Sequence, residues 1–157
     1  MNSTVYLETS IIGYLASRPS RDLITAANQQ LTRDWWEDHR QQYDLYVSES
    51  VVAESSAGDP QAAQERLDVI KDIPVLDVTE EAENLAEELL KSVPLPENAE
   101  VDALHIAIAT VNGMDYLLTW NCAHIANAAL QSQIEAICRS AGFEPPTICT
   151  PQQLMEG

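Results

Sequence analysis

The chain has few basic residues and a strong excess of acidic ones. Only 8 of its 157 residues are lysine or arginine against 25 acids, which gives a formal net charge of −17. Proteins that bind nucleic acid through many phosphates usually carry a basic surface, so extensive contact of that kind is disfavoured. The charge is uneven, because four arginines lie within residues 18–40, whereas nine acids and one lysine lie within residues 77–102. The acidic stretch predicts a solvated helix face, with repulsion of nucleic acid or binding of a basic partner segment as alternatives.

The sequence also lacks the usual features of membrane proteins, secreted proteins and zinc-binding proteins. No apolar run reaches the roughly 18 residues of a transmembrane helix, and the start MNSTVYLETS lacks the basic and apolar regions of a signal peptide. We therefore expect no membrane association and a cytoplasmic location. Cys122, Cys138 and Cys149 are odd in number and lack C-x-x-C spacing, which favours buried free thiols in a reducing compartment. The three histidines show no zinc-ligand spacing, and no phosphate-binding glycine motif occurs.

Short apolar runs alternate with helical patterns along the whole chain. Helical segments include one from Leu23 to about Arg40 with a predicted apolar face of Leu23, Ala27, Leu31 and Trp35, and one from near Asn98 that stops before Gly113. Strands are predicted at residues 4–7, 44–48, 74–78, 116–119 and 146–149. The alternation predicts one α/β domain over residues 1–157, with a central, mostly parallel sheet of four to five strands and helices on both faces.

Four polar residues stand where such a fold would bring them together. Glu8 and Asn121 each follow a predicted strand, in YLETS and YLLTWN, whereas Glu54 and Asp102 lie in the helical segments SVVAES and VDALHIAIA. Positions just past the carboxyl ends of parallel strands converge on one crevice. Grouped carboxylates repel one another and offer oxygen ligands, so they suit a hard divalent cation. The pattern predicts metal-dependent chemistry on phosphate.

Each of these residues also has a structural interpretation. Glu54 could simply face solvent on its helix, and Asp102 could interact with the dipole at the start of its helix. Asn121 could cap the following helix through its side-chain oxygen. Glu8, directly after an apolar strand in the centre of the sheet, is the hardest of the four to explain as a surface charge.

Three neighbouring residues are secondary candidates. Ser10 is expected to cap the first helix rather than to contact a ligand. Thr119 either orients a carboxylate or only ends its strand. His105 lies one helical turn after Asp102, so it either pairs with that residue or serves as a buried structural histidine.

In order along the chain, YLETS, SVVAES, DALHIAIA and LLTWN resemble the four site motifs of the PIN-domain family. The resemblance is to the VapC-type toxins of type II toxin–antitoxin pairs. It implies an endoribonuclease that depends on Mg²⁺ or Mn²⁺, with RNA as substrate, a cognate antitoxin protein as partner and a homodimer as assembly. It also implies Glu8, Glu54 and Asp102 as metal ligands, with Asn121 as a fourth catalytic residue. Arg18, Arg21 and Arg33 are candidates for steering the RNA backbone, or are ordinary surface charges.

Two positions depart from the family pattern. The first acid is usually aspartate, and the extra methylene of Glu8 moves the carboxylate by about 1.5 Å. The fourth position is commonly aspartate, and the neutral Asn121 lowers the charge of the site. Both changes favour weaker metal binding. They leave open a degenerate PIN-like domain that acts as a non-catalytic binding or regulatory module. A small phosphatase-like hydrolase with the same metal site is a third alternative.

Overall fold

A parallel β-sheet forms the centre of the computed structural model, which describes residues 2–96, 98–121 and 127–156. The strand order is β3-β2-β1-β4-β5, and every pair is parallel. Strands β2 and β3 are added in order on one side of β1, and β4 and β5 are added in order on its other side. The predicted parallel sheet is confirmed, and its strands are β1 (Ser3–Leu7), β2 (Tyr43–Ser48), β3 (Val75–Leu76), β4 (Tyr116–Leu118) and β5 (Thr147–Cys149).

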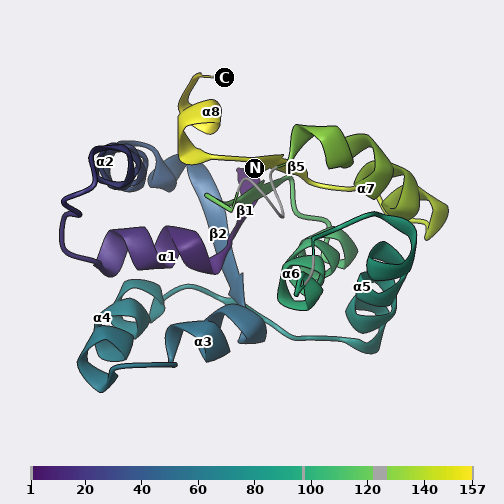
Figure 1. The fold of residues 1–157 in the computed structure, drawn as a ribbon, viewed down its shortest axis with the longest axis horizontal. Coiled ribbons are helices and arrows are strands. Elements are labelled where there is room, and N and C mark those ends of the chain that lie inside the picture. The colour runs from purple at the N-terminus through teal and green to yellow at the C-terminus, as the bar shows by residue number, and fades with distance from the viewer. Residues whose placement is uncertain (1, 97, 122–126, 157) are drawn as a thin grey trace.

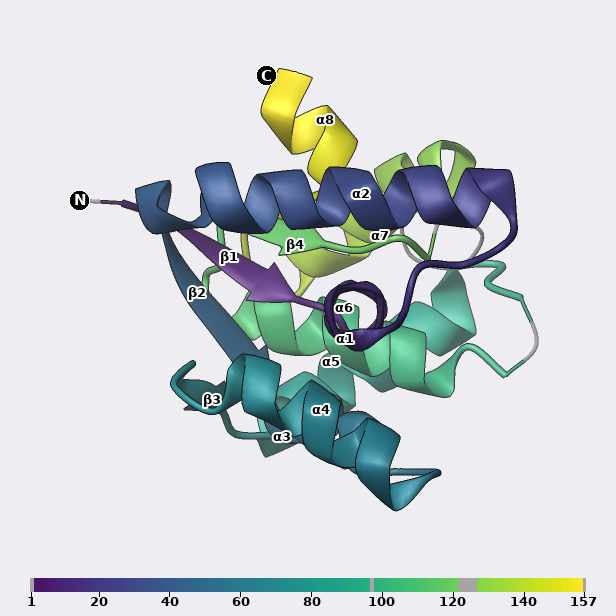
Figure 2. The same cartoon turned by 90° about the vertical axis from the view of Figure 1, so that its left-hand side faces the viewer.

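Helices cover both faces of this sheet (Figures 1 and 2). One face carries α1 (Thr9–Ala16) and α2 (Leu23–Asp38), and the other carries α5 (Glu80–Ser92), α6 (Glu100–Val111) and α7 (Ala128–Ser140). The remaining elements extend the first layer: α3 (Glu49–Ser55) and α4 (Pro60–Ile70) pack against α1, whereas the 3-10 turn η1 (Arg40–Gln42) and α8 (Pro151–Glu156) pack against α2. The short α8 is not among the predicted elements.

The core lies on both sides of β1. Val5, Tyr6 and Leu7 have no exposed surface, as expected for a central strand covered on both faces. On one side α6 is buried along almost its whole length and packs between the sheet and α5. A helix that is apolar around its circumference is stable only in such a position.

The predicted apolar face of α2 is partly wrong. Trp35 is buried as expected, but Leu23 is 85% exposed. The buried face instead includes Gln29 and Thr32. Buried polar side chains are stable where they are hydrogen-bonded, and Thr32 Oγ1 accepts a 2.7 Å hydrogen bond from Trp120 Nε1. Such tertiary partners override the helical hydrophobic pattern at these positions.

Several predicted helix ends are confirmed, and one is shifted. Thr79 caps α5 by accepting from the backbone N–H of Ala82. Gly113 follows α6 with a φ of 68°, the left-handed conformation that glycine adopts readily. The helix expected from near Asn98 begins at Glu100 instead. Within the described residues, no helix combines the length and apolarity that a membrane crossing requires.

Candidate active site

The carboxyl ends of β1 and β4 meet where the order of strands reverses. Glu8, directly after β1, donates its backbone N–H to Leu118 O at 3.1 Å. Thr119, directly after β4, donates from Oγ1 to Glu8 Oε1 at 2.6 Å. In open parallel sheets, ligands bind in the crevice at such a switch point. The sheet therefore places Glu8, only 5% exposed, at the position that the sequence predicts.

Glu8 also caps α1, a role that the sequence assigned to Ser10. Its Oε1 accepts a 3.1 Å hydrogen bond from the backbone N–H of Ser10 and a short hydrogen bond from Ser10 Oγ. Ser10 Oγ in turn accepts from the backbone N–H of Trp120 at 2.9 Å. Together with Thr119, three donors converge on one oxygen of Glu8. They fix the carboxylate at the start of α1 and connect it to the segment after β4.

Asp102 and Asn121 join the same cluster. Asn121 donates its backbone N–H to Thr119 Oγ1 at 2.9 Å, and its side-chain Nδ2 to Asp102 Oδ1 at 3.0 Å. Asn127, not Asn121, caps α7. An amide next to Asp102 can donate to the carboxylate, whereas a second carboxylate there would repel it. Hydrogen bonds thus connect Glu8 to Asp102 through Thr119 and Asn121.

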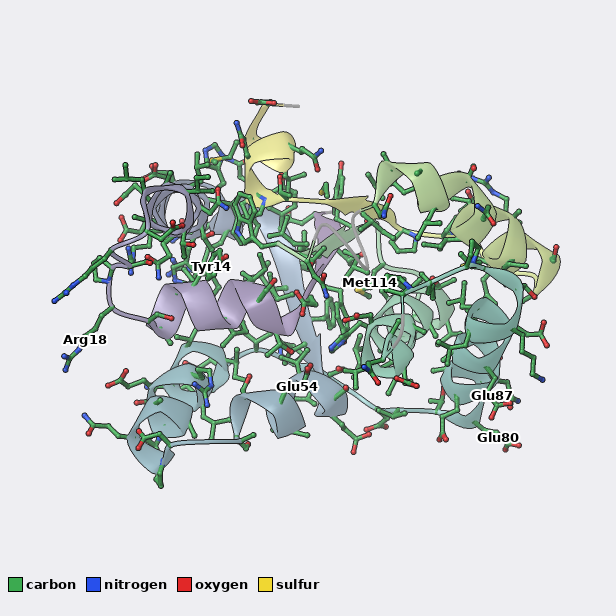
Figure 3. The ribbon with its side chains drawn as sticks, viewed as in Figure 1. Tyr14, Arg18, Glu54, Glu80, Glu87 and Met114 are labelled. Atoms are coloured by element: carbon green, nitrogen blue, oxygen red, sulfur yellow. The ribbon has the colours of Figure 1, made fainter. Side chains whose placement is uncertain are left out.

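Glu54 lies beside this cluster on α3, below the start of α1 (Figure 3). Its Oε1 accepts from Thr9 Oγ1 at 2.5 Å and lies 2.7 Å from His105 Nε2. The Glu54 side chain is 38% exposed, whereas His105 is fully buried. Burial alone would raise the pKa of Glu54, but the hydrogen bonds from His105 and Thr9 outweigh it and hold the pKa below its usual value. Glu54 is therefore ionised at neutral pH.

Tyr6 and Ser48 continue this arrangement into the core. Tyr6 Oη lies 2.6 Å from His105 Nδ1 and 2.7 Å from Ser48 Oγ. Burial is the main reason that the pKa of Tyr6 is far above its usual value, so its hydroxyl keeps its proton. Both ring nitrogens of His105 are engaged by Tyr6 and Glu54, so the alternative of an Asp102–His105 pair is wrong. No sequence signal indicated Tyr6, which is indistinguishable there from an apolar strand residue.

The cluster offers the oxygen ligands that Mg²⁺ and Mn²⁺ prefer. Every hydrogen bond that Glu8 and Glu54 accept within the described residues goes to Oε1, which leaves Oε2 of each carboxylate for another ligand. In the same part of the chain, no three acidic, histidine or cysteine side chains are arranged to hold a metal ion. The carboxylate oxygens are ligands that suit a divalent cation. Such an ion could bind at Oε2 and keep the hydrogen bonds at Oε1, or bind at Oε1 and displace them.

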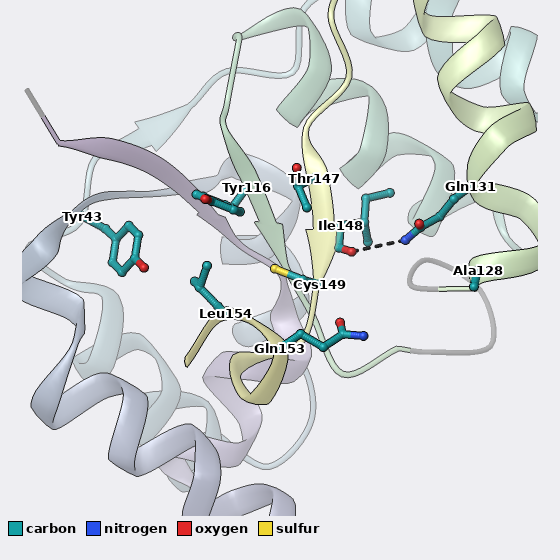
Figure 4. Close-up of a pocket in the computed structure, with 9 residues that line it drawn as sticks. All are labelled: Tyr43, Tyr116, Ala128, Gln131, Thr147, Ile148, Cys149, Gln153 and Leu154. Carbon is teal, nitrogen blue, oxygen red and sulfur yellow. Dashed lines mark hydrogen bonds between the residues drawn. The ribbon is translucent and has the colours of Figure 1, made fainter. Parts of the chain in front are cut away.

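A cavity of about 500 Å³ lies away from this cluster (Figure 4). Its lining includes Tyr43, Tyr116 and Thr147, the first residues of β2, β4 and β5, whereas Glu8 and Thr119 follow the last residues of their strands. Cys149 also lines it, and burial raises the pKa of this thiol to about 11. Cys149 and Cys138 are buried free thiols, as predicted, and Cys122 lies outside the described residues.

Charge is distributed unequally around the cluster. Arg18 extends from the chain just after α1, and Glu80 and Glu87 lie on α5 across the molecule (Figure 3). Arg33 also reaches the end of α1, where its Nη2 donates to Ser17 O at 2.9 Å. These two arginines therefore lie at the end of α1 that is opposite to Glu8.

Comparison with known proteins identifies the fold. No protein-family model matches the chain, and no curated protein matches its sequence. The structure of VapC20 from Mycobacterium tuberculosis, described as a sarcin-ricin loop cleaving toxin, superposes with a TM-score of 0.58 at 19% identity, over 90% of this chain and 99% of that chain. VapBC2 from Rickettsia felis, bound to a DNA fragment from its promoter, superposes with a TM-score of 0.59 at 15% identity, over 94% and 98%. The chain has the PIN-like fold of these structures.

Proposed function

We propose that this chain is a metal-dependent endoribonuclease that acts as the toxin of a toxin–antitoxin pair. The observation that carries the proposal is the placement of three carboxylates around the β1–β4 switch point. Hydrogen bonds connect Glu8 to Asp102 through Thr119 and Asn121. Glu54 lies beside them, bound to Thr9, the residue that follows Glu8. The structural likeness to VapC20, a sarcin-ricin loop cleaving toxin, supports the same assignment.

In this proposal Glu8, Glu54 and Asp102 would hold Mg²⁺ or Mn²⁺, and their side chains would have to move together to do so, because the described residues form no ready ligand set. When bound, such an ion polarises a phosphoryl oxygen and lowers the pKa of a water molecule. Neighbouring side chains of the protein hold these carboxylates in place. Thr119 and Ser10 hold Glu8 through Oε1, and Asn121 holds Asp102 through Oδ1. An ionised carboxylate such as Glu54 can accept a hydrogen bond from the attacking water and orient it toward phosphorus.

We also propose that the RNA backbone runs along α1 toward a basic group formed by Arg18, Arg33 and Arg66. Arg33 contacts Ser17 O, and Arg18 and Arg66 line a cavity of about 240 Å³ together with Ser17. Glu65 is part of the same lining. An α-helix of eight residues is about 12 Å long, so the basic group stands within a few nucleotides of the cluster. This basic group contains three of the eight basic residues of the whole chain.

An antitoxin protein and a second copy of this chain are the proposed partners. The VapC-like motifs and the likeness to the VapBC2 complex support them. Two copies with a net charge of −17 repel one another, so we expect salt to strengthen a homodimer by screening. Light scattering at low and high salt tests the dimer, and co-purification with the product of a neighbouring short reading frame tests the antitoxin. The buried free thiols agree with a cytoplasmic location.

Cleavage of RNA by the purified chain tests the nuclease. We expect cleavage of single-stranded or structured RNA with Mg²⁺ or Mn²⁺, and its loss with EDTA or with Asp102→Asn. Glu87→Gln, which removes one charge from α5, is the matched control and should retain wild-type activity. Equal cleavage by the wild type and Asp102→Asn at high protein concentration would show that the activity does not come from this cluster.

The alternative is a non-catalytic binding module. The observation that favours it is the Asn121–Asp102 hydrogen bond, which satisfies Asp102 with a neutral donor where the family commonly has a carboxylate. RNA binding by the wild type without metal-dependent cleavage would favour this alternative over the nuclease.

A further inference from the structure

A row of buried polar side chains lies behind Glu54, and the chemistry proposed above does not use it. It consists of Ser48, Tyr6 and His105, all with no exposed surface. We propose that His105, with a proton on Nε2, is a positioning residue that connects this row to Glu54 and holds the carboxylate by Oε1, so that Oε2 faces the cluster. The inference rests on the proposed function, in which Glu54 belongs to the active site.

The contacts in the row are short and come from four different elements. Ser48 Oγ, at the end of β2, accepts from the backbone N–H of Val51 at 3.2 Å. Ser48 and Tyr6 hydroxyl oxygens are 2.7 Å apart, and Tyr6 Oη is 2.6 Å from His105 Nδ1. His105 Nε2 is 2.7 Å from Glu54 Oε1. Elements β1, β2, α3 and α6 therefore contribute one polar side chain each to a continuous hydrogen-bonded path, and α3 also contributes the backbone N–H of Val51.

The direction of the hydrogen bonds follows from counting donors and acceptors. Ionised Glu54 only accepts, so His105 Nε2 carries a proton and donates. If Nδ1 is unprotonated, it accepts from Tyr6 Oη–H, Tyr6 accepts from Ser48 Oγ–H, and Ser48 accepts from the Val51 N–H. Every buried hydrogen then has an acceptor. With a proton on Nδ1, the direction of each hydrogen bond in the row reverses. The Ser48 hydroxyl hydrogen then has no acceptor among the described residues, and an unpaired hydroxyl in the core costs free energy.

The row acts on Glu54 because that side chain is otherwise weakly restrained. Glu54 is 38% exposed, and a glutamate side chain at the surface samples several rotamers whose restriction costs free energy. Thr9 and His105 both bind Oε1, from α1 and α6. Two rigidly held donors on one oxygen fix the orientation of the other. Partners of this kind behind a ligating side chain typically change metal affinity by about 10–100-fold when removed.

The proton assignment is testable by nitrogen NMR of the metal-free protein with ¹⁵N-labelled histidine. We expect His105 to show a protonated Nε2 and an unprotonated Nδ1 that accepts a hydrogen bond. Tyr6→Phe should move the Nδ1 signal toward that of a free acceptor while Nε2 stays protonated. A wild-type His105 with its proton on Nδ1 would overturn the proposal.

Two substitutions of similar size separate positioning from simple filling of the core. His105→Gln places an amide N–H near the former Nε2 and retains the donor to Glu54, whereas His105→Asn places its amide near the former Nδ1 and cannot reach Glu54. Urea unfolding selects conditions in which both variants are folded. We expect the Glu54 carboxyl ¹³C signal to remain near its wild-type position in His105→Gln and to shift in His105→Asn, and we expect Mn²⁺ to bind about tenfold more weakly or worse only in the latter.

Identical Glu54 carbon signals in the two folded variants would overturn the positioning role, because His105 would then only satisfy Tyr6. This signal is recorded without metal. A wild type that binds no Mn²⁺ and cleaves no RNA would refute the proposed function, while the carbon signal would still decide whether His105 positions Glu54.

Discussion

Thr119 Oγ1 lies 2.6 Å from Glu8 Oε1 and joins the ends of two adjacent strands, although the two residues are 111 positions apart in the sequence. Thr119 Oγ1 also accepts from the backbone N–H of Asn121. One buried hydroxyl group therefore orients the first carboxylate of the cluster and positions the residue that contacts the third. The geometry of the site therefore depends on the hydroxyl group of Thr119, an uncharged side chain.

Thr119→Val should destabilise the protein and weaken metal binding. Valine has nearly the same shape but leaves Glu8 with one donor fewer in a buried position, which costs about 1–3 kcal/mol. Urea unfolding of the metal-free protein and Mn²⁺ titration measure the two effects. Thr147→Val, at an exposed position of β5, is the control and should change stability by less than about 0.5 kcal/mol. Equal stability of the two variants would contradict the role of Thr119.

Asn121→Asp should make the fold more dependent on a divalent cation. The new carboxylate would replace a donor to Asp102 by a like charge, so we expect the metal-free protein to lose about 1 kcal/mol or more. Mn²⁺ should raise the melting temperature of this variant by more than that of the wild type. Asn84→Asp adds the same charge at an exposed position of α5 and controls for net charge. An equal Mn²⁺-induced shift in all three proteins would argue against a metal at the cluster.

Glu54 should contribute to the loss of stability in acid. Burial opposes ionisation, but hydrogen bonds from His105 and Thr9 hold the folded-state pKa of Glu54 below its usual value. A carboxyl group with a depressed folded-state pKa stabilises the fold above its unfolded-state pKa, and this stabilisation disappears as the pH falls through the folded-state pKa.

Metal-free Glu54→Gln should therefore lose less stability than the wild type between about pH 5 and about pH 3. Urea unfolding at several pH values measures the difference. Glu87→Gln on α5 should follow the wild-type curve. Parallel curves for the wild type and Glu54→Gln would contradict the hydrogen bonding described for this carboxylate.

Arg18→Glu should weaken RNA binding more than catalysis. Reversing a charge at the basic end of α1 removes a favourable phosphate interaction, so we expect a higher KM, a smaller change in kcat and a shallower dependence of KM on salt. Lys91→Glu on α5 makes the same charge change on the acidic side of the molecule and should have little effect. If both variants raise KM equally, the effect is one of net charge and the proposed RNA path is wrong.

The sequence was sufficient for the class of fold because its main signals are local. Alternating strand and helix patterns predicted the parallel sheet, and the signals at Thr79 and Gly113 predicted two helix ends correctly. The order β3-β2-β1-β4-β5 depends on pairings between distant segments, which no local pattern contains. Leu23 shows the converse failure: it fits a helical apolar stripe, yet the fold leaves it exposed and buries Gln29 with specific partners.

The candidate site was predictable in its carboxylates but not in what holds them. Glu8, Glu54, Asp102 and Asn121 follow from motif positions. Hydrogen bonds connect Glu8, Asn121 and Asp102 through Thr119, whereas Glu54 is bound to Thr9 and His105. The capping role of Glu8 and the Glu54–His105 contact could not be predicted, because each depends on how segments far apart in the chain approach one another. A sequence motif shows which residue types are present, whereas the hydrogen-bond partners of those residues depend on the tertiary structure.

The central position of β1 has a consequence for the chain during its synthesis. β1 is made first, but its neighbour β4 begins at Tyr116, and the cluster is complete only once Asn121 of the 157 residues is available. Contacts of such long sequence separation form late and slowly in folding. A growing polypeptide thus carries Glu8 and Glu54 for most of translation as isolated carboxylates. The carboxylates can therefore be brought together only after the segment that follows β4 has been synthesised and β4 has paired with β1.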